Sequence, residues 1–279
     1  MVRRPHWSYS QISQFLRCPL QYYFDRIAKI PRAFTTSGLL LGGAVHEALA
    51  AYHTGLQSSR PLSKDELAEV FLAGWQKRHA EGPVQFSKGE TISELVDQGI
   101  ALLEAYVEEP PPERIKAVEK ELLVPLHTSQ GEVLEKPLVA VLDLLCEEGE
   151  QLTVIEFKTS SRKYGSAEVD RSLQAVAYRH ACQEKYDRPT RVRYTVLVKT
   201  KTPTVQHLDV TQAEGGFSRL GDLVQSVERA IEVGAFYPIE NAMNCSGCPF
   251  REPCRDWQGT QRPGVQELEP CKACRTVIC

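Results

Sequence analysis

The sequence predicts an α/β domain in which helices flank a central β-sheet. Residues before about 109 follow a helical periodicity of apolar side chains, and the Pro-rich stretch EEPPPER (108–114) then interrupts it. After this break the pattern changes to that of β-strands. A helical segment at 168–186 separates the first strands from two more, and this alternation of strands and helices is typical of an α/β domain.

The predicted helices can be taken in chain order. Ser10 is a candidate cap for a helix in SYSQISQFLRCP, and Pro19 can begin a second helix, PLQYYFDRIAKI. The glycines of LLLGGAVHEALAAYHTG open a longer helix that we expect to end near Gly55. Two further helices are expected at 64–80 and 89–109.

The predicted strands begin as a hairpin meander, because the turn sequences SQGE and EEGE separate the first three. After the helix at 168–186 come two more strands and a long helix at 212–234. The remaining residues are rich in Cys and Pro, and we expect them to be irregular. The five strands are expected at 114–127, 133–146, 151–159, 190–200 and 203–210.

The composition is that of a globular chain of 279 residues, with 42% apolar and 25% charged residues. A net charge of −3 argues against a broadly basic coat for duplex DNA. The stretch 185–201 nevertheless holds six Lys or Arg against one Asp. It is either a solvated pair of strands or a surface that faces phosphates.

The sequence gives no signal for a membrane or for secretion. No apolar run approaches the roughly 18 residues of a membrane span, and MVRRPHWSYSQ lacks the apolar region of a secretory signal. We therefore expect a cytoplasmic protein without a membrane partner. The absence of a G-x-x-x-x-G-K-[ST] loop excludes a P-loop motor in this sequence.

Nine cysteines are many for such a chain, because a reducing cytosol disfavours disulfides. Clustered cysteines indicate metal or redox chemistry there, and six of the nine lie in the last 35 residues. Cys146 and Cys182 stand alone in apolar patterns and are expected to be small core residues. The others are Cys18, Cys245, Cys248, Cys254, Cys271, Cys274 and Cys279.

One predicted strand, LTVIEFKTSS (152–161), carries charge inside an apolar run. Glu156 and Lys158 are two residues apart, so strand geometry places them on the same face. An ion pair alone is a poor explanation, because the cost of desolvation usually cancels the attraction. The pair therefore indicates chemistry rather than stability.

The preceding strand, PLVAVLDLLCEE, carries a lone carboxylate, Asp143. Pairing about the turn at Glu148–Gly149 brings Asp143 near Glu156, and the register allows both to face one side. Adjacent carboxylates repel, and a divalent cation such as Mg²⁺ or Mn²⁺ relieves the repulsion. Lys158 could then orient or deprotonate a water, or stabilise charge on a phosphate. The alternative is a salt bridge on a solvated face, which the apolar neighbours disfavour.

Asp143 followed by Glu156-x-Lys158 resembles the core of the PD-(D/E)XK nuclease superfamily. This D…ExK pattern alone is short and common, but further stretches from Ser8 to Cys254 agree in order with one group. That group is the RecB-like iron–sulfur nucleases, which include the nuclease domain of AddB-type helicase–nucleases and the CRISPR-associated iron–sulfur exonucleases. GGAVHEAL resembles the family's helix with a metal-binding histidine, and LQAVAY resembles its Q-x-x-x-Y motif.

The resemblance assigns roles to residues that have simpler explanations when taken singly. His46 on its apolar helix would more often be a core residue. Gln174 and Tyr178 share one helix face and could simply border the core. Glu119, in RIKAVEKELLVPL, either points to the site or lies on an exposed strand edge. Leu142 departs from the family, since many relatives have an arginine directly before the aspartate.

The resemblance implies a restriction-endonuclease-like core with a central mixed sheet and a helical insertion at 56–113. Lys158 would be catalytic, and Gln174 and Tyr178 would place it or the DNA strand. The implied ligands of the divalent metal are His46, Asp143, Glu156 and the carbonyl of Phe157.

A compact motif near the C-terminus, NCSGCPFREPC, has cysteine spacing C-x2-C-x5-C and brings Cys245, Cys248 and Cys254 together. The resemblance supplies Cys18, in LRCPLQYYF, as the fourth ligand of a 4Fe–4S cluster that binds the C-terminal segment. A structural Zn²⁺ site on the same cysteines is the chemical alternative. PCKACRTVIC adds three cysteines beyond the family pattern, and we assign them no role.

These observations predict a nuclease domain at 1–258 and a Cys-containing tail at 259–279. The implied activity is metal-dependent exonuclease action on DNA ends, with single strands preferred, in DNA repair, recombination or CRISPR adaptation. Two alternatives remain. One is a nuclease subunit that is active only with helicase or CRISPR-adaptation proteins, and the other is a non-cutting DNA-binding module with a zinc site.

Overall fold

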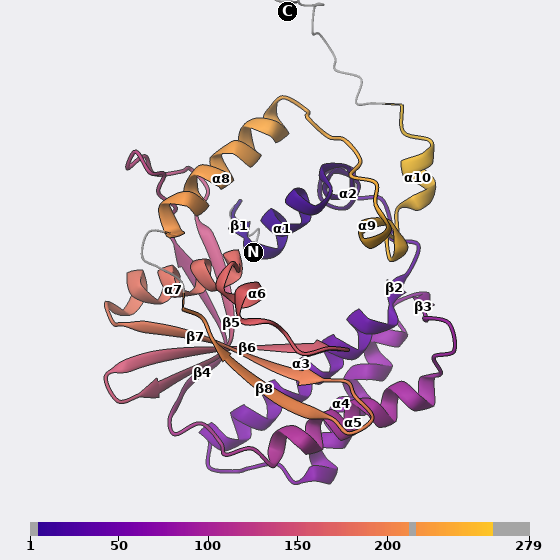
Figure 1. Cartoon of the computed structure of the whole chain (residues 1–279), viewed down its shortest axis with the longest axis vertical. Coiled ribbons are helices and arrows are strands. Elements are labelled where there is room, and N and C mark those ends of the chain that lie inside the picture. The colour runs from indigo at the N-terminus through magenta and orange to yellow at the C-terminus, as the bar shows by residue number, and fades with distance from the viewer. Residues whose placement is uncertain (1–4, 212–215, 259–279) are drawn as a thin grey trace, which may run out of the picture.

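Six strands pair into one sheet, which Figure 1 shows at the centre of the molecule. The computed structural model describes residues 5–211 and 216–258. The strands of this sheet are β1 (Trp7–Ser8), β4 (Ile115–Val124), β5 (Leu138–Glu148), β6 (Gln151–Ser160), β7 (Thr190–Val198) and β8 (Thr204–Asp209). Two further short strands, β2 (Thr35–Thr36) and β3 (Val84–Gln85), form a separate parallel pair.

The sheet combines both pairing directions. β5 is antiparallel to β4 and β6, and β7 is antiparallel to β8. β6 and β7 are parallel, as expected for strands that a helix connects, and β1 adds to the start of β5 in parallel. The prediction of an α/β fold with a central mixed sheet is therefore confirmed.

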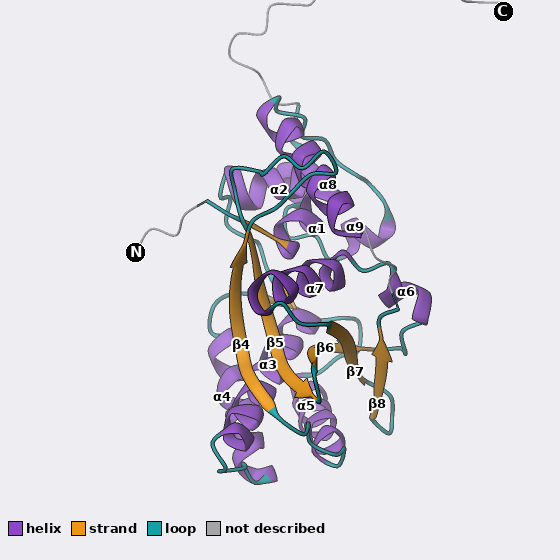
Figure 2. Cartoon of the chain, turned by 90° about the vertical axis from the view of Figure 1, so that its left-hand side faces the viewer, coloured by secondary structure: helices purple, strands orange, loops and turns teal. Residues whose placement is uncertain are grey.

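Helices cover both faces of the sheet (Figures 1 and 2). One face carries α3 (Ser37–Gln57), α4 (Lys64–His79) and α5 (Ile92–Val107). The other carries α1 (Tyr9–Arg17), α7 (Leu173–Tyr186) and α8 (Gly216–Glu232). Short elements complete the described chain: α2 (Pro19–Tyr22), a π-helical turn (Tyr23–Ile27), α6 (Ser166–Asp170), α9 (Ala242–Ser246) and α10 (Arg251–Arg255).

Each layer of helices has its own hydrophobic core. The α3-side core includes Leu41, Val45, Phe71 and Leu102, all almost fully buried. The α7-side core includes Val154, Ala177, Val192 and Val224. None of the helices within 5–211 and 216–258 is both long enough and apolar enough to cross a membrane.

Three local predictions need correction. Ser8, and not Ser10, caps α1, because the Ser8 hydroxyl accepts from the Gln11 N–H while the Gln11 side chain accepts from the Ser8 N–H. The helix expected at 168–186 is two helices, since the Ser172 hydroxyl accepts from Ala175 N–H and starts α7 afresh. The C-terminal segment, expected to be irregular, contains α9 and α10.

The side-chain alternation of two strands reverses in mid-strand. In β5, Leu142 packs in the α7-side core, whereas Leu144, two residues later, packs in the α3-side core. In β4 the same reversal separates Leu122 from Val118. Regular strands keep residues two apart on one face, so each strand must be irregular between these positions.

Glu119 and Asp143 occupy the point of reversal on the two strands. The register pairs the residues on either side of Glu119 with those on either side of Asp143, so the two carboxylates stand opposite each other. Glu119 has a φ of 48°, in the left-handed region that an L side chain rarely adopts. This irregularity turns the strand over and places both carboxylates at the junction of the two cores.

The two ends of the described chain lie side by side. The Leu20 N–H donates to the Tyr237 carbonyl at 3.1 Å, and the Asn244 side chain donates to the Arg17 carbonyl at 2.9 Å. The rings of Phe24 and Phe250 add a contact, with centroids 6.0 Å apart. Backbone hydrogen bonds and aromatic packing thus join segments more than 200 residues apart in sequence.

Candidate active site

The β5–β6 hairpin opens into a fork at the predicted site. Going away from the turn, the last paired residues of the two strands are Leu144 and Ile155. Beyond them the Asp143 carboxylate, rather than a backbone carbonyl, accepts the hydrogen bond of the Phe157 N–H at 2.8 Å. The register inferred from the sequence therefore brings Asp143 and Glu156 to the same place, where the strands part.

Glu156 is the buried carboxylate of the fork, with 3% of its surface exposed. Its Oε1 accepts hydrogen bonds from Lys158 Nζ at 2.5 Å and from Gln174 Nε2 at 2.8 Å. Its Oε2 is buried and has no hydrogen-bond partner among the described residues. Burial and the neighbouring charge of Asp143 raise the pKa of Glu156.

Lys158 is held in place from α7. Its Nζ donates to Gln174 Oε1 at 3.1 Å, and Gln174 in turn donates to the Tyr178 hydroxyl at 2.7 Å. Burial alone would lower the pKa of Lys158, but the charge and hydrogen bond of Glu156 outweigh it and raise the pKa. Gln174 and Tyr178 lie four residues apart on one face of α7, and their hydrogen bonds form one network with Glu156 and Lys158 of β6.

His46 reaches the fork from the opposite face, on α3. A Cβ added at Gly42 would lie 3.3 Å from Thr159 Oγ1, so this glycine lets the helix pack close to β6. His46 Nδ1 lies 3.5 Å from Asp143 Oδ2. Burial lowers the pKa of His46, but the hydrogen bond and charge of Asp143 outweigh this effect and raise it. α3 therefore positions an imidazole beside the carboxylate that the metal hypothesis requires.

For Glu119, the sequence allowed two explanations: that it points to the site or that it lies on an exposed strand edge. The sheet places it opposite Asp143, at the reversal point of β4. Partial burial and the charge of Asp143 raise the pKa of Glu119, while the charge of His46 lowers it. Glu119 is thus a third carboxylate near the fork, and its position in the hairpin register opposite Asp143 was the signal that could have found it.

The arrangement fits a divalent cation without already forming a complete cage. No three side chains of His, Cys, Asp or Glu in 5–211 and 216–258 converge as a metal-binding group. Asp143 accepts a hydrogen bond from a backbone N–H, and Glu156 accepts one from Lys158. The unpaired, buried Glu156 Oε2 and the mutual repulsion of the carboxylates are the features that a bound cation would satisfy.

The Phe157 carbonyl also faces the fork. In a strand, the N–H and C=O of one residue point to the same side. Since the Phe157 N–H donates to Asp143, its carbonyl points toward β5 rather than into the ladder with β7. This direction agrees with the prediction that the Phe157 carbonyl is a ligand, which stays a prediction.

The basic stretch at 185–201 is occupied by ion pairs. Arg188 lies 2.8 Å from a Glu147 oxygen, and Arg193 lies 2.7 Å from an Asp209 oxygen. Arg191 also pairs with a carboxylate, that of Glu148. These contacts favour the explanation of a solvated strand pair over a surface that faces phosphates.

The structure also gathers the predicted cluster cysteines into one region. Burial and the neighbouring thiols of Cys18, Cys248 and Cys245 raise the pKa of Cys254. All four are free thiols and partly exposed, and Cys18 Sγ accepts from the Ile239 N–H at 3.5 Å. The other tail cysteines, Cys271, Cys274 and Cys279, lie outside the described residues. Cys146 and Cys182 are buried in the cores, as predicted.

The chain also matches known proteins. The family model of the PD-(D/E)XK nuclease superfamily matches residues 6–255. The chain belongs to the PD-(D/E)XK nuclease superfamily. The predicted superfamily is thereby confirmed, and the class of activity is hydrolytic nuclease. Members typically use divalent metals such as Mg²⁺ or Mn²⁺, whereas the narrower iron–sulfur group stays a prediction.

A solved structure resembles this superfamily member in fold. The crystal structure of a candidate exonuclease from Eubacterium rectale has a TM-score of 0.54 and 11% identity, over 94% of this chain and 91% of that chain. The crystal structure of SSO0001 is 13% identical over 86% of this chain and 92% of that chain, with a TM-score of 0.30 that carries no fold argument. None of the curated proteins matches the chain significantly.

Proposed function

We propose that this chain is a metal-dependent exonuclease that hydrolyses phosphodiester bonds in DNA. One observation carries the proposal: in a member of a nuclease superfamily, a buried Glu156 keeps one oxygen unpaired beside Asp143 while its other oxygen holds Lys158. Such a polar group costs free energy unless a partner completes it. A catalytic cation is the partner that this chemistry suggests.

The ligands of the cation would be His46, Asp143, Glu156 and the carbonyl of Phe157. When bound, a divalent cation acidifies water and neutralises phosphate charge. Oxygen-rich donors favour Mg²⁺ or Mn²⁺. The His46 nitrogen tilts this preference toward Mn²⁺ without excluding Mg²⁺.

Lys158 supplies positive charge where the reaction needs it. A water oxygen attacks phosphorus and gives up one proton to solvent, the bond from phosphorus to the bridging oxygen breaks, and the departing oxygen takes up one proton from solvent. The raised pKa of Lys158 keeps it an ammonium at neutral pH, so it orients the water and stabilises the negative charge on the phosphate. Gln174 fixes Lys158 through its amide oxygen, and Tyr178 fixes Gln174.

The proposal extends to the setting of the reaction. The substrate is a DNA end, with single strands preferred, and the pathway is repair, recombination or CRISPR adaptation in the cytoplasm. The name of the Eubacterium rectale protein supports exonuclease action by analogy of fold alone. A helicase or CRISPR-adaptation protein would be the partner if the chain acts only as a subunit. The remaining alternative, a non-cutting module, is disfavoured by the complete His/Asp/Glu/Lys set.

A second centre is proposed for Cys18, Cys245, Cys248 and Cys254. The charges of the other thiols raise the pKa of Cys248 and of Cys254, so the four lie in one region, and none forms a disulfide. No three of them converge as a metal-binding group within 5–211 and 216–258, so the proposal of a 4Fe–4S cluster rests on their proximity and on the resemblance. This would make the chain a RecB-like iron–sulfur nuclease. A tetrahedral Zn²⁺ site remains the chemical alternative.

The activity test uses purified protein with end-labelled single- and double-stranded DNA, with Mn²⁺, with Mg²⁺ or with EDTA. We expect loss of terminal nucleotides only when metal is present. The Glu156→Gln variant is the matched inactive control, because it keeps the shape of the side chain and removes its charge. Stable DNA binding without cleavage under every condition would favour the non-cutting module. Cleavage only after addition of a cell extract would favour the subunit.

A further inference from the structure

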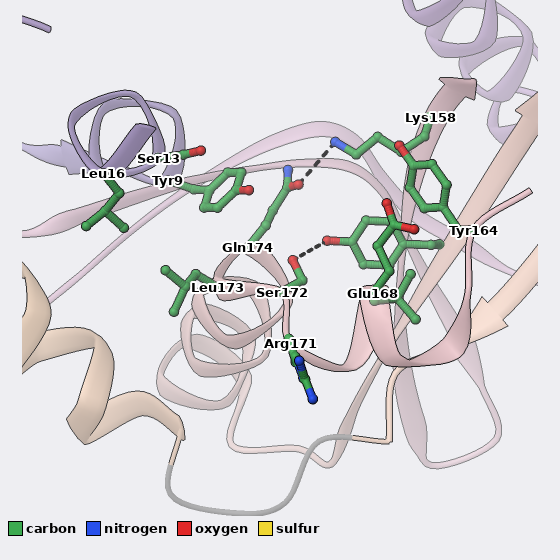
Figure 3. A pocket seen from close by; sticks show the side chains of 12 residues that line it. Tyr9, Ser13, Leu16, Lys158, Tyr164, Glu168, Arg171, Ser172, Leu173 and Gln174 are labelled. Carbon is green, nitrogen blue, oxygen red and sulfur yellow. Dashed lines mark hydrogen bonds between the residues drawn. The ribbon is translucent and has the colours of Figure 1, made fainter. Parts of the chain in front are cut away.

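A cavity of about 380 Å³ opens beside Lys158 and Gln174 (Figure 3). Its walls carry three tyrosines from three elements: Tyr9 of α1, Tyr164 of the loop between β6 and α6, and Tyr194 of β7. We call it the tyrosine cavity. Its volume lies in the range of sites that bind small molecules or single groups of larger ones.

Tyr164 lies in a loop, yet its position is fixed. Its N–H donates to Gln206 Oε1 at 2.9 Å, and its carbonyl accepts from Gln206 Nε2 at 3.0 Å. The Arg162 guanidinium lies over its ring, 5.8 Å from the centroid, and is itself held by Glu168. The ring is therefore presented to the cavity in one place, so binding there costs little ordering of the loop.

Tyr194 connects the cavity to the catalytic residues. It is 3% exposed, and a hydrogen bond of 2.6 Å joins its hydroxyl to Ser172 Oγ. Lys158 Nζ lies 6.0 Å from the centroid of its ring. Figure 3 shows Tyr9 and Tyr164 on opposite sides of Gln174. The cavity thus has aromatic side walls and ends at the catalytic ammonium.

Positive charge accompanies these aromatic walls. The charged side chains that line the cavity are Lys158, Arg171 and Glu168, and the Glu168 carboxylate pairs with Arg162 at 3.0 Å. α7 begins at Leu173, also a lining residue, so the N-terminal end of this 14-residue helix faces the cavity. Helix N-termini favour anions, and Lys158 adds a full positive charge. The combination suits a flat aromatic group joined to phosphates.

We propose that the tyrosine cavity binds an unpaired nucleobase of the DNA strand, with the phosphate beside that base at Lys158. This inference rests on the proposed nuclease function and explains why single strands would be preferred. Bases of any sequence stack on a tyrosine ring. A base inside a duplex has both faces covered by its neighbours and must first be unstacked to enter.

The test combines a change in the protein with a change in the DNA. Cleavage of a labelled oligodeoxythymidine would be measured for the wild type, Tyr164→Ala and Tyr164→Phe, together with the same strand carrying abasic residues at either end. We expect Tyr164→Ala to raise KM about tenfold with little change in kcat, because base stacking contributes to binding. Tyr164→Phe keeps the ring and should behave like the wild type.

The abasic strand makes the test specific. It should raise the KM of the wild type by a similar factor or more but have a much smaller effect on Tyr164→Ala, since that variant has already lost the contact between the base and Tyr164. Tyr237→Ala, which changes an exposed tyrosine outside the cavity, is the control and should leave KM unchanged. Additive losses, or equal KM values for intact and abasic strands, would overturn the proposal.

Binding measurements distinguish an error in the cavity assignment from an error in the proposed nuclease function. The same series measured by fluorescence anisotropy in EDTA gives Kd values that require no cleavage. If the wild type cuts but Tyr164→Ala binds and cuts intact strands equally well, then the cavity assignment is wrong and the function stands. If nothing is cut but the stacking losses appear in Kd, the cavity assignment stands and the function is wrong.

Discussion

The carboxylate fork and the cysteine region both join parts of the chain that are distant in sequence, but they do so differently. At the fork, the ladder between β5 and β6 ends at Leu144, the residue directly after Asp143, and Glu156 is almost fully buried. At the cysteine region, Cys18 follows α1, and the other thiols lie on or beside α9 and α10, which have five residues each. These thiols are partly exposed.

The two regions differ in what holds their side chains in position. The backbone ladder and the Lys158–Gln174–Tyr178 hydrogen bonds set the fork before any ligand arrives. Helices of five residues have little stability of their own, so packing and a bound cofactor must hold the thiols. We expect loss of a ligand to abolish chemistry at the fork and to lower stability at the cysteine region.

The largest effect is expected at Asp143. Asp143→Asn keeps an oxygen for the Phe157 N–H but removes the charge that a cation needs, so kcat should fall about a thousandfold or more. Steady-state cleavage with Mn²⁺ measures this, and the melting temperature should change little. Glu150→Gln, at the exposed turn of the same hairpin, is the control. Activity equal to the wild type in Asp143→Asn would contradict the metal assignment.

Lys158 should show the next largest effect. Lys158→Met keeps the length of the side chain without its charge, and we expect kcat to fall roughly a hundredfold. Mn²⁺ affinity, measured by calorimetry, should be retained because Lys158 is not a ligand. An affinity loss as large as that of Asp143→Asn would mean that its role is misassigned.

The cysteine region should respond in stability rather than in chemistry. Cys18→Ala should give protein without iron or acid-labile sulfide, with a melting temperature lowered by roughly 5 °C or more. Activity per folded molecule should stay within about tenfold, since the fork lies on other elements. Cys271→Ala is the matched control and should keep the brown colour. Colour lost in Cys271→Ala but kept in Cys18→Ala would contradict the assigned ligands.

The smallest expected effect is a pH dependence of the metal-free protein. The folded pKa of Glu156 is raised to about 7, so folding retains a proton that the unfolded chain releases near its ordinary pKa. Stability from this group is therefore present at low pH and lost as the pH rises through about 7. Urea unfolding in EDTA between pH 5 and pH 8 should show this decline, as about 1 kcal/mol or more.

The pH profile of the Glu156→Gln variant tests the contribution of Glu156 to stability. His46, whose pKa is also raised, acts in the same direction, whereas buried His53, whose pKa is lowered to about 4, acts in the opposite direction. Both groups remain in Glu156→Gln, so the difference between the two pH profiles contains the titration of Glu156 and the part of the raised His46 pKa that the charge of Glu156 causes. If stability fell with pH equally steeply in the wild type and in Glu156→Gln, the pKa of the Glu156 carboxyl would not be raised in the folded protein.

The features that could be predicted from the sequence are those that depend on local residue patterns. Alternation and the Glu148–Gly149 turn gave the register that brings Asp143 to Glu156, and helical spacing placed Gln174 and Tyr178 together. The left-handed Glu119 could not be predicted, because its conformation is imposed by tertiary packing against an intrinsic preference.

The tyrosine cavity was missed for a different reason. Tyr9, Tyr164 and Tyr194 lie in three elements that no local periodicity relates, and only the assembled fold brings them together. The Ser8 cap was missed because two serines compete there, and the capping partner Gln11 decides between them.

The reversal of β4 and β5 at Glu119 and Asp143 has a consequence for the life of the protein in a cell. Asp143 is in place only when one half of its strand has joined each core, so neither layer alone can assemble the fork. A chain in which only one layer has folded would therefore lack the fork that the proposed activity requires. The proposed nuclease activity would thus depend on the folding of both layers, so a partly folded chain would not cut DNA.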